Sequence, residues 1–543
     1  MMILKKKILV TCALPYANGP IHIGHLLEHI QADILVRYQR MLGHEVWFIC
    51  ADDSHGTPII LKSRELYIHP KKLISKMFQN HICDLKCFNI SYDNYSSTHH
   101  SINLYFLKKL YYTLKLNNLI TLKKVIQLYD VKENIFLPDR FVQGICPNCY
   151  AKDQYGDHCE LCNSVYKTIE LINPVSKISN TEPVLRNSMH IFFDIAVLQN
   201  TLYEWMQTGV LHKHIVNKMK EWFYKSLKSW NISRDKPYFG FRIPDFKNKY
   251  FYVWMDAPIA YISTFKNLCY NNPLINFHEF WNINSSTELY HFIGKDIVYF
   301  HILFWPAMLE SMKFRKPTKI FVHGHVKIKG MKISKSKGYV ITVKKWLKYF
   351  DSDSLRYYYA SKLSSKIEDI DFNVQDFIYK INSDLVNKIV NLASRSSSFL
   401  NKYFDNMLSK KLDNIKLYTQ FVSVSHKIKY FFQDLDFNLV IKEVIKLSEI
   451  ANQYFNHNKP WKILDPKNSI KLQEICSTAI NLFRIIMIYL KPIVPNLVNK
   501  SEKFLLTILD WNNIHIPLLN HRISIFKTLY ARIDTTNIDD LFK

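Results

Sequence analysis

The sequence predicts an α/β protein: a doubly wound, Rossmann-like parallel sheet with an inserted metal-binding segment, followed by an all-α bundle. Three observations indicate this architecture. Strand, helix and strand signals alternate over residues 8–50, four cysteines cluster within 146–162, and strand signals fade after about residue 355 of the 543. A strand–helix–strand run of this length is a βαβ unit, which implies parallel strands.

The first βαβ unit is predicted from its hydrophobic pattern. Residues 8–14 are a short apolar run closed by Pro15, and residues 45–50 are a second run, as expected of buried strands. Residues 22–42 carry apolar side chains on one helical face and stop at Gly43. Because parallel sheets bind ligands beyond the carboxyl ends of their strands, we expect the ligand beside the residues that follow these two strands.

The hydrophobic pattern divides the rest of the chain into an insertion, a second α/β part and a helical part. Residues 118–235 interrupt the α/β alternation, which resumes through 250–254 and 289–294. Long amphipathic stretches at 376–402 and 470–490 predict a helical bundle.

Composition and charge narrow the class of protein. The chain is 48% hydrophobic and 22% charged, which excludes disorder, and its net charge is +26. This surplus favours a polyanionic partner, nucleic acid before an acidic membrane, although a coding bias toward lysine explains part of it. The apolar run at 8–13 is too short for a signal peptide, and no run reaches about 18 residues, so we expect no membrane span.

The start of the first predicted helix carries the pattern H-x-G-H. A helix N-terminus binds phosphate through its unpaired N–H groups, and Gly24 lets a ligand approach the backbone. His22 and His25 share one helical face and can donate to phosphate oxygens. There are two alternatives. The histidines could be purely structural, or they could bind a metal together with His29, although no carboxylate lies at a usual ligand spacing beside them.

A lysine-rich loop lies about 300 residues downstream, at 327–338. Its glycines and its interleaved lysines, Lys332 and Lys335 among them, suit a loop that closes over phosphates during phosphoryl or nucleotidyl transfer. A solvated basic loop is the alternative. The Walker and dinucleotide glycine patterns are absent from the sequence, so a nucleotide would be held in another way.

The cysteine cluster predicts one closed zinc site. Cys146 and Cys149 form one C-x-x-C knuckle, and Cys159 and Cys162 form a second. Four thiolates complete a tetrahedral zinc shell and leave no open position, so the site is expected to be structural. Two disulfides between the four cysteines are the alternative. The other cysteines are scattered along the chain, as in proteins of the reducing cytosol, so disulfides are disfavoured and a cytoplasmic protein is predicted.

Two of these segments resemble the HIGH and KMSKS signatures of class I aminoacyl-tRNA synthetases: His22-Ile23-Gly24-His25 and Lys332-Ile333-Ser334-Lys335-Ser336. Four further segments, 13–19, 48–57, 252–258 and 294–296, are similar to the bacterial type of the methionyl-tRNA synthetase family. The resemblance covers essentially the whole chain.

The resemblance implies a role for each matching residue. Charge on the phosphates would be stabilised by His22, His25, Lys332 and Lys335. ATP would be bound by His22, Gly24, His25, Gly294, Asp296 and Lys335. Methionine would be bound by Ala13, Leu14, Tyr16, Asp53, Trp254, Ala257, Pro258, Tyr261, Ile297 and His301. The tRNA anticodon would be bound by Asn391, Arg395, Pro460 and Trp461.

General chemistry agrees with these implied roles. A buried carboxylate such as Asp53 suits an ammonium group, and a polarizable thioether suits an aromatic pocket. Aromatic stacking next to arginine and asparagine is how single-stranded RNA loops are recognised. By composition alone, however, both Trp254 and Trp461 would be expected to be core residues.

The implied activity is methionine–tRNA ligation for translation initiation and elongation. L-methionine and MgATP would give methionyl-adenylate, and initiator and elongator tRNA(Met) would accept methionine at the 3'-terminal adenosine. The expected parts are the first half of the catalytic domain (1–117), a connective insertion with the zinc knuckle (118–235), the second half (236–325), the KMSKS-type loop and stem-contact region (326–385), and the helical anticodon-binding domain with the C-terminal tail (386–543).

The chain departs from the family pattern at two places. Ile333 replaces the usual methionine of the second signature, and its β-branching stiffens the loop. The sequence ends at Lys543 without a C-terminal dimerisation domain, so a monomer is expected. Other possibilities are a class I synthetase for another amino acid, a non-catalytic tRNA-binding relative, and a small-molecule adenylate-forming ligase.

Overall fold

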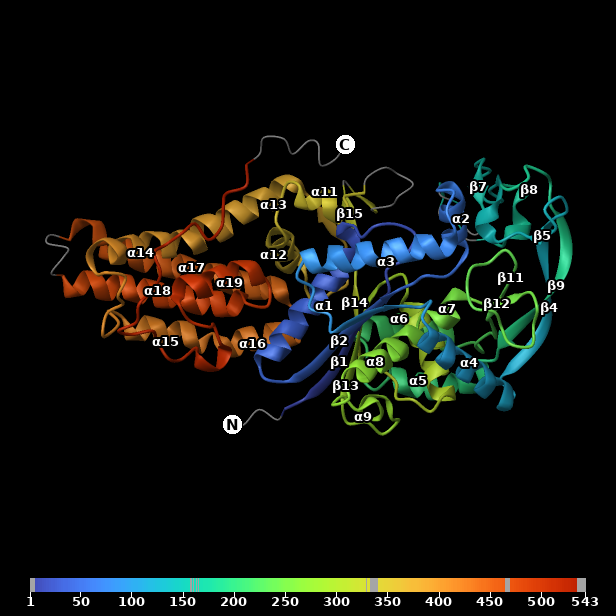
Figure 1. The fold of residues 1–543 in the computed structure, drawn as a ribbon, viewed down its shortest axis with the longest axis horizontal. Coiled ribbons are helices and arrows are strands. Elements are labelled where there is room, and N and C mark those ends of the chain that lie inside the picture. The colour runs from blue at the N-terminus through green and yellow to red at the C-terminus, as the bar shows by residue number, and fades with distance from the viewer. Residues whose placement is uncertain are drawn as a thin grey trace.

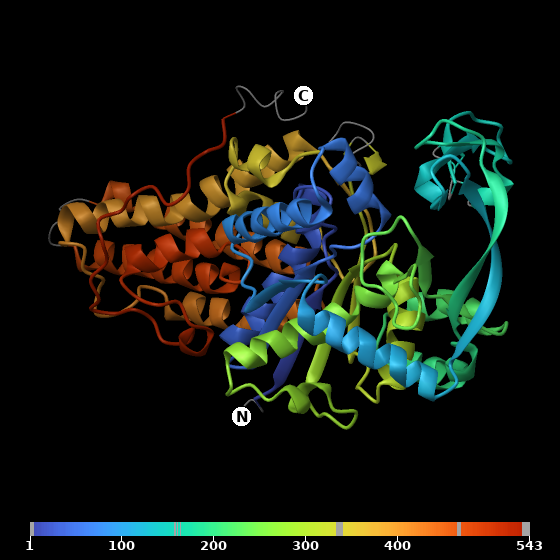
Figure 2. The same cartoon turned by 45° about the vertical axis from the view of Figure 1, so that its right-hand side comes forward.

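The computed structural model describes residues 5–156, 159, 161–162, 164, 166–328, 330–332, 340–463 and 469–534, with the backbone alone at 331–332. The parallel sheet lies at the centre, a helical bundle extends from one side of it, and a long two-stranded ribbon stands on the other side (Figures 1 and 2). None of the described helices is long and apolar enough to cross a membrane.

The central sheet has five parallel strands in the order β14-β13-β1-β2-β3. Its strands are β1 (Lys7–Cys12), β2 (Glu45–Asp52), β3 (Asn94–Ser97), β13 (Glu288–Gly294) and β14 (Lys319–His323). The chain order doubles back at β1, between β2 and β13, as a doubly wound sheet requires. The predicted strands at 8–14, 45–50 and 289–294 are therefore confirmed.

Helices cover both faces of this sheet (Figure 1). The helices of this part of the chain are α1 (Ile23–Met41), α2 (Thr57–Glu65), α3 (Pro70–Cys87), α4 (Ser101–Leu116), α7 (Val253–Asp256), α8 (Ile259–Asn271), α9 (Phe277–Trp281) and α10 (Trp305–Ser311), of which α2 lies beside the insertion instead of on the sheet. Helix α1 confirms the helix predicted at 22–42, with His22 as its N-cap.

The insertion between β3 and β13 is built on an antiparallel ribbon. Strands β4 (Ile120–Asp130) and β9 (Val184–Phe193) pair over ten residues. Strands β5 (Ile135–Phe136) and β10 (Trp230–Asn231) extend this sheet, and β6 (Val142–Ile145), β7 (Gln154–Tyr155) and β8 (Ile172–Ser176) form a small sheet at the ribbon's far end. Helices α5 (Gln199–Met206) and α6 (Lys213–Phe223) follow.

At 250–254, where the α/β alternation was predicted to resume, the chain forms a strand followed by a helix, but this strand lies outside the central sheet. Strand β12 (Lys249–Phe251) pairs antiparallel with β11 (Ser233–Asp235), outside the central sheet, and the chain then turns into helix α7. Within the segment Phe251 is buried and the other four residues are half-buried, and none of them pairs with β13. A short apolar run does not distinguish a sheet strand from another buried segment.

The second half of the chain begins with a three-stranded sheet and continues as helices. The strands are β15 (Val326–Ile328), β16 (Met331–Lys332) and β17 (Ile370–Phe372). The helices are α11 (Val343–Leu347), α12 (Ser352–Lys362), α13 (Val374–Lys380), α14 (Asn391–Tyr403), α15 (Ile415–Ser423), α16 (Ser425–Gln433), α17 (Phe437–Asn458), α18 (Ile470–Leu490) and α19 (Pro495–Leu505). A π-helical stretch, Ile381–Val390, joins α13 to α14.

The bundle confirms the predicted helical region but differs from it in α18. Nearly every residue of α18 is buried, so this helix is the axis of the bundle rather than an amphipathic surface helix. One continuous core runs from α1 through α12 into the bundle. Within it the buried Arg356 donates to Asp33 of α1 at 2.7 Å and to the carbonyls of Phe88, Pro492 and Ile493.

Candidate active site

The first signature segment forms the start of helix α1. His22 caps α1, and its Nδ1 accepts from the backbone N–H of Gly24 at 3.1 Å and of His25 at 3.4 Å. The two histidine rings stack with centroids 3.6 Å apart. Gly24 therefore opens the first turn of α1, where backbone N–H groups and the helix dipole favour an anion.

The chain that follows the lysine-rich loop pairs with the start of α1. Ile23 N donates to Ile341 O at 3.0 Å, and Val343 N donates to Ile21 O at 3.2 Å. The chain after the loop thus returns to the cap of α1, although the sequence separation exceeds 300 residues. Lys335 and Ile333 lie outside the described residues, and Lys332 is described only through its backbone in β16.

The carboxyl end of β13 presents the other residues expected to bind ATP. Gly294 is the last residue of this strand, and a Cβ there would lie 2.7 Å from Asp296 Oδ1. Glycine therefore allows the Asp296 carboxylate to fold back over the strand end. Asp296 Oδ1 lies 3.9 Å from His325 Nε2.

His29 does not share a ligand face with the two signature histidines. It is buried, and its Nδ1 is hydrogen-bonded to Tyr92 at 2.6 Å. Among the described residues, the groups with metal-ligand geometry that include a histidine contain His29 with Cys12 and Glu28, and not His22 or His25. The structure thus gives no support to a metal held by the three histidines together.

Asp53 follows β2 and lies next to Tyr16, with which it forms a backbone bridge. Its side chain is buried, and Oδ1 has no hydrogen-bond partner among the described residues. Burial, reinforced by the charge of Asp256, raises the pKa of Asp53 well above its usual range. A buried carboxylate oxygen without a partner is costly, so the site is built to receive a hydrogen-bonding or cationic group.

His55 connects the loop after β2 to the far wall, a role that its place in the sequence did not reveal. Its Nδ1 is hydrogen-bonded to Asp256, its Nε2 to His99 Nδ1 at 2.8 Å, and its carbonyl accepts from the Tyr16 hydroxyl. Burial lowers the pKa of His55 to about 3, so its ring is neutral. His55 lies in the segment 48–57, which carried the resemblance, but spacing alone assigned it nothing.

An aromatic cluster surrounds Tyr261 and His301, two of the residues expected to bind methionine. His301 Nδ1 donates to Ile297 O at 3.0 Å, so its Nε2 accepts from the Tyr261 hydroxyl at 2.9 Å. Burial lowers the pKa of His301 to about 4, which keeps this ring neutral. Trp254 stacks on Phe300 with centroids 3.9 Å apart. His301 lies in a π-helical turn, Phe300–Phe304, a feature often found at functional sites.

The other residues expected at the methionine site border the same core. Ala13 and Leu14 follow β1 and pack on the apolar cluster that also receives Trp254 and Ile297. Ala257 and Pro258 are buried where α7 passes into α8. All ten of these residues thus come from the carboxyl ends of β1 and β2, the α7–α8 junction and the chain after β13.

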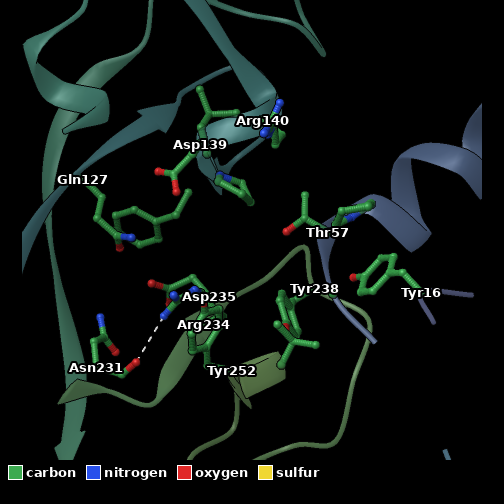
Figure 3. Close-up of a pocket in the computed structure, with 16 residues that line it drawn as sticks. Tyr16, Thr57, Gln127, Asp139, Arg140, Asn231, Arg234, Asp235, Tyr238 and Tyr252 are labelled. Atoms are coloured by element: carbon green, nitrogen blue, oxygen red, sulfur yellow. Dashed lines mark hydrogen bonds between the residues drawn. The ribbon is translucent and has the colours of Figure 1, made fainter. Parts of the chain in front are cut away.

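A separate cavity of about 450 Å³ opens beside Tyr16 (Figure 3). It lies between the loop after β2 and the insertion, and its lining contains none of the Tyr261, His301 and Asp53 side chains. Polar side chains, two arginines among them, line the insertion side. They are Gln127, Asp139, Arg140, Asn231, Arg234 and Asp235. No motif in the sequence marked this set of residues.

The four clustered cysteines meet as predicted. Cys149 Sγ lies 3.5 Å from Cys159 Sγ, and Cys146 Sγ lies 3.9 Å from Cys162 Sγ, so neither pair is a disulfide. All four sulfurs lie within 4.8 Å of one another. Tetrahedral zinc with bonds of about 2.3 Å requires sulfurs about 3.8 Å apart, so this donor set fits the metal.

Trp461 is half exposed, which is contrary to the core position that composition alone favoured. The Arg395 guanidinium lies over its ring at 5.5 Å and donates to Asn456 at 2.7 Å. Asn391 is exposed one helical turn before Arg395, and Pro460 is buried beneath the tryptophan's turn. An aromatic face, a guanidinium and an amide therefore share one surface of the bundle.

Comparison with known proteins agrees with this geometry. A family model described as tRNA synthetases class I (M) matches residues 8–397. The parallel sheet, the histidine-capped helix at its carboxyl edge and this match define a class I aminoacyl-tRNA synthetase.

Similar proteins identify the family within this class. The chain is 59% identical over 536 residues to a methionine–tRNA ligase of Buchnera aphidicola subsp. Baizongia pistaciae, covering 98% of each protein. It is 54% identical over 540 residues to the corresponding ligase of Wigglesworthia glossinidia brevipalpis, again covering 98% of each. The chain belongs to the methionine–tRNA ligase family.

The fold is also that of a solved structure. Mycobacterium tuberculosis methionyl-tRNA synthetase in complex with methionyl-adenylate superposes with a TM-score of 0.80 at 20% identity, over 97% of this chain and 100% of that one.

Proposed function

We propose that the protein is a ligase that activates L-methionine with MgATP and transfers it to tRNA(Met). The carboxylate oxygen of methionine attacks the α-phosphorus, the bond to the β-phosphate breaks, and methionyl-adenylate and pyrophosphate form. A ribose hydroxyl of the 3'-terminal adenosine then attacks the adenylate carbonyl, and AMP leaves. The observation that carries the proposal is the buried Asp53 carboxylate, whose Oδ1 has no partner among the described residues.

The amino-acid site suits methionine. Asp53 would pair with the α-ammonium, next to Tyr16 and the backbone of Ala13. Ala13, Leu14, Tyr16, Trp254, Ala257, Pro258, Tyr261, Ile297 and His301 would enclose the side chain. The Tyr261 hydroxyl donates a hydrogen bond to the neutral His301, so the walls offer no charge at the position of the thioether. A thioether is a weak acceptor and suits an apolar pocket.

The nucleotide site would be shared by α1 and the lysine-rich loop. His22, Gly24 and His25 offer the helix N-terminus and two ring donors to the phosphates, and Gly294 and Asp296 border the ribose side. Lys332 and Lys335 would bring positive charge to the transition state, with Mg²⁺ entering as the ATP complex. Positioning and electrostatics supply the rate, since the reaction needs no protein nucleophile.

The bundle would bind the anticodon of initiator and elongator tRNA(Met). Trp461 would stack on a base, with Arg395 and Asn391 as hydrogen-bond donors and Pro460 holding the turn. In this assignment residues 386–543 form the anticodon-binding domain, 1–117 and 236–325 the catalytic domain, 118–235 the connective insertion, and 326–385 the loop and stem-contact region.

Replacing Trp461 tests the anticodon site. Trp461→Ala should lower kcat/KM for tRNA(Met) by about tenfold to a hundredfold, because one base–aromatic stack contributes ~1–3 kcal/mol. Trp222→Ala, at another half-exposed tryptophan, serves as the control. Equal charging by the two variants would refute the role of Trp461.

Zinc, oligomeric state and compartment complete the proposal. One structural Zn²⁺ held by Cys146, Cys149, Cys159 and Cys162 is supported by their fit to a tetrahedral site. A monomer in the cytoplasm is the proposed working form. Sedimentation of the purified protein checks the monomer, and zinc analysis per chain checks the metal.

Amino-acid-dependent ATP–pyrophosphate exchange with purified protein tests the function itself. Exchange with methionine and none of the other nineteen amino acids is the expected result. Exchange with another amino acid would leave the class intact and overturn the pocket assignment. Exchange with none, from folded and zinc-loaded protein, would point to a non-catalytic tRNA-binding protein.

A further inference from the structure

A cavity of about 480 Å³ lies where the edge of the central sheet, the insertion and the bundle meet. Its walls are helix α1, the edge strand β14, the turn between α5 and α6, and the turn between α16 and α17. None of the described residues that line it is expected to bind ATP, methionine or the anticodon. The volume is within the usual range of ligand sites, and most of the wall is apolar, as such sites require.

Gln31 is a buried polar side chain in the wall of this cavity. It is only 3% exposed, and its Oε1 has no hydrogen-bond partner among the described residues. It also lines a smaller adjoining cavity of about 230 Å³. A buried amide oxygen without a donor is costly, so we expect the site to receive a group that supplies one. The amide nitrogen adds donors beside this acceptor, which suits a planar ring with a donor next to an acceptor.

Adenine is the base whose edge satisfies this oxygen. It presents an amino donor next to a ring-nitrogen acceptor, and a glutamine amide binds both groups at once. Guanine presents two acceptors at the same edge and would leave Oε1 without a partner. The half-buried rings of Tyr290 and Phe321 line the same cavity, with centroids 5.5 Å apart, and offer an aromatic surface to a base.

The other end of the cavity carries donors for a phosphate. The eight positions from Gln31 to Gln39, both in the wall, span about 12 Å of helix α1, which is comparable to the length of a nucleoside monophosphate. Beyond Gln39 lie His44 and Lys6. Burial and the charge of Lys6 lower the pKa of His44, and its Nδ1 accepts from Lys6 N at 3.2 Å, so the proton lies on Nε2 and can be donated.

The charges that line the cavity are separated between its two sides. Lys6 and Lys319 lie on the sheet side, where Lys6 Nζ pairs with Glu288 at 2.8 Å and Lys319 Nζ donates to Gly209 O at 2.7 Å. Each ammonium has further donors for a phosphate. On the bundle side, Asp434 is exposed, and a carboxylate suits ribose hydroxyls.

We propose that this cavity is a second binding site for an adenine nucleotide, separate from the catalytic centre. Gln31 would bind the edge of the base, Tyr290 and Phe321 would contact the ring, and His44 and Lys6 would bind the phosphate. The proposal goes beyond the ligase function, because no step of that reaction uses these residues. Since the cavity lies between the sheet and the bundle, a bound nucleotide would contact both parts.

AMP binding in the presence of a saturating, non-hydrolysable analogue of methionyl-adenylate tests the proposal. The analogue occupies the catalytic centre, so equilibrium dialysis with labelled AMP counts the sites that remain. The wild type should still bind about one AMP per chain. GMP should bind at least about tenfold more weakly, because it leaves the buried Gln31 oxygen without a donor.

Gln31→Met tests the base end of the site, because it keeps the length of the side chain and removes the amide. AMP should bind about tenfold more weakly to this variant, and the preference for AMP over GMP should disappear. The melting temperature should not fall, because the substitution removes an unpartnered buried oxygen, so the loss of binding is separate from folding. Gln420→Met, at an exposed glutamine of α15, is the matched control and should bind AMP as the wild type does.

Lys6→Met tests the phosphate end independently. It should weaken the binding of AMP severalfold and leave the binding of adenosine unchanged, because adenosine has no phosphate. Lys5→Met, at the exposed neighbour that does not line the cavity, is the control.

Three results would each overturn the proposal: loss of all AMP binding when the analogue is added, equal affinity for AMP and GMP, or unchanged AMP binding by Gln31→Met. An equal loss of adenosine and AMP binding in Lys6→Met would overturn the placement of the phosphate beside Lys6.

Discussion

At Asp53, the protonation state that favours the stability of the free protein differs from the one that methionine binding requires. Its pKa is raised by burial and by Asp256, so an empty site disfavours the ionised form that the ammonium needs. A carboxyl group with a raised folded-state pKa costs stability once the pH exceeds its unfolded-state pKa, and that cost grows as the pH rises toward the folded pKa. Methionine binding would reverse this by supplying the missing positive charge.

Asp53→Asn should therefore abolish activity and stabilise the free protein. Exchange should fall by about a hundredfold or more, because a buried ammonium loses its counter-charge, while the melting temperature at neutral pH should rise. In the wild type, the KM for methionine should increase as the pH falls, starting at a higher pH than for an ordinary carboxylate. Exchange kinetics across pH and thermal unfolding measure these effects.

The exposed Glu65 of α2 provides the control for this prediction. Glu65→Gln should leave both the exchange rate and the melting temperature unchanged. A wild-type KM that is flat with pH, or an Asp53→Asn variant that melts lower, would show that Asp53 is ionised and well paired in the free protein.

At the scale of elements, one side chain of helix α12 bonds to both the catalytic part and the bundle. Arg356 is fully buried, and its donors reach α1, the residue after α3 and the turn between α18 and α19. Arg356→Ala should destabilise the protein by ~3–5 kcal/mol, since the buried charge of Asp33 would keep only Arg37 as an ionic partner, beside the hydrogen bonds from Ser91.

Arg356→Lys should rescue little of this loss, because an ammonium cannot reach the separate acceptors that the planar guanidinium serves. Denaturant unfolding followed by tryptophan fluorescence measures both variants. Full stability of Arg356→Lys would mean that charge alone, rather than the fork geometry, holds the junction.

The zinc knuckle is an element with a core of its own. The apolar residues around Cys146 and Cys159 form a cluster separate from the two large cores. Removal of zinc by a chelator should therefore unfold β6–β8 and leave the sheet and bundle folded. Hydrogen exchange should report the loss locally, and aminoacylation should fall more than exchange.

Cys146→Ser should reproduce the effect of the chelator, and Cys83→Ser, at an exposed cysteine outside the cluster, should not. Global unfolding on chelation would show that the insertion supports the central sheet, contrary to the separation of the cores.

At the scale of the whole molecule, the net charge of +26 should strengthen the binding of tRNA and have little effect on the binding of ATP and methionine. Phosphate contacts release counterions, so the affinity for tRNA(Met) should fall linearly with salt on logarithmic axes, by about tenfold or more between 50 and 200 mM. Methionine-dependent exchange should change little over this range. A flat tRNA affinity would assign the surplus charge to coding bias rather than to binding.

The sequence by itself determined the features that depend on local pattern. The strand run closed by Pro15, the helix stopped at Gly43 and the paired C-x-x-C knuckles are local, because periodicity, turn residues and ligand spacing act over a few positions. The resemblance to a known family added expected roles for residues such as Tyr261 and His301. These residues are far apart in the sequence, so their spacing does not indicate that they share a site.

The tertiary structure alone decided how distant segments meet. It turned 250–254 away from the central sheet, left Trp461 half exposed and made His55 the junction of Tyr16, Asp256 and His99. It also formed the cavity from the loop after β2 and the insertion. These features depend on contacts between residues far apart in the chain, whose partners are set by the packing of the whole core, and no local pattern records them.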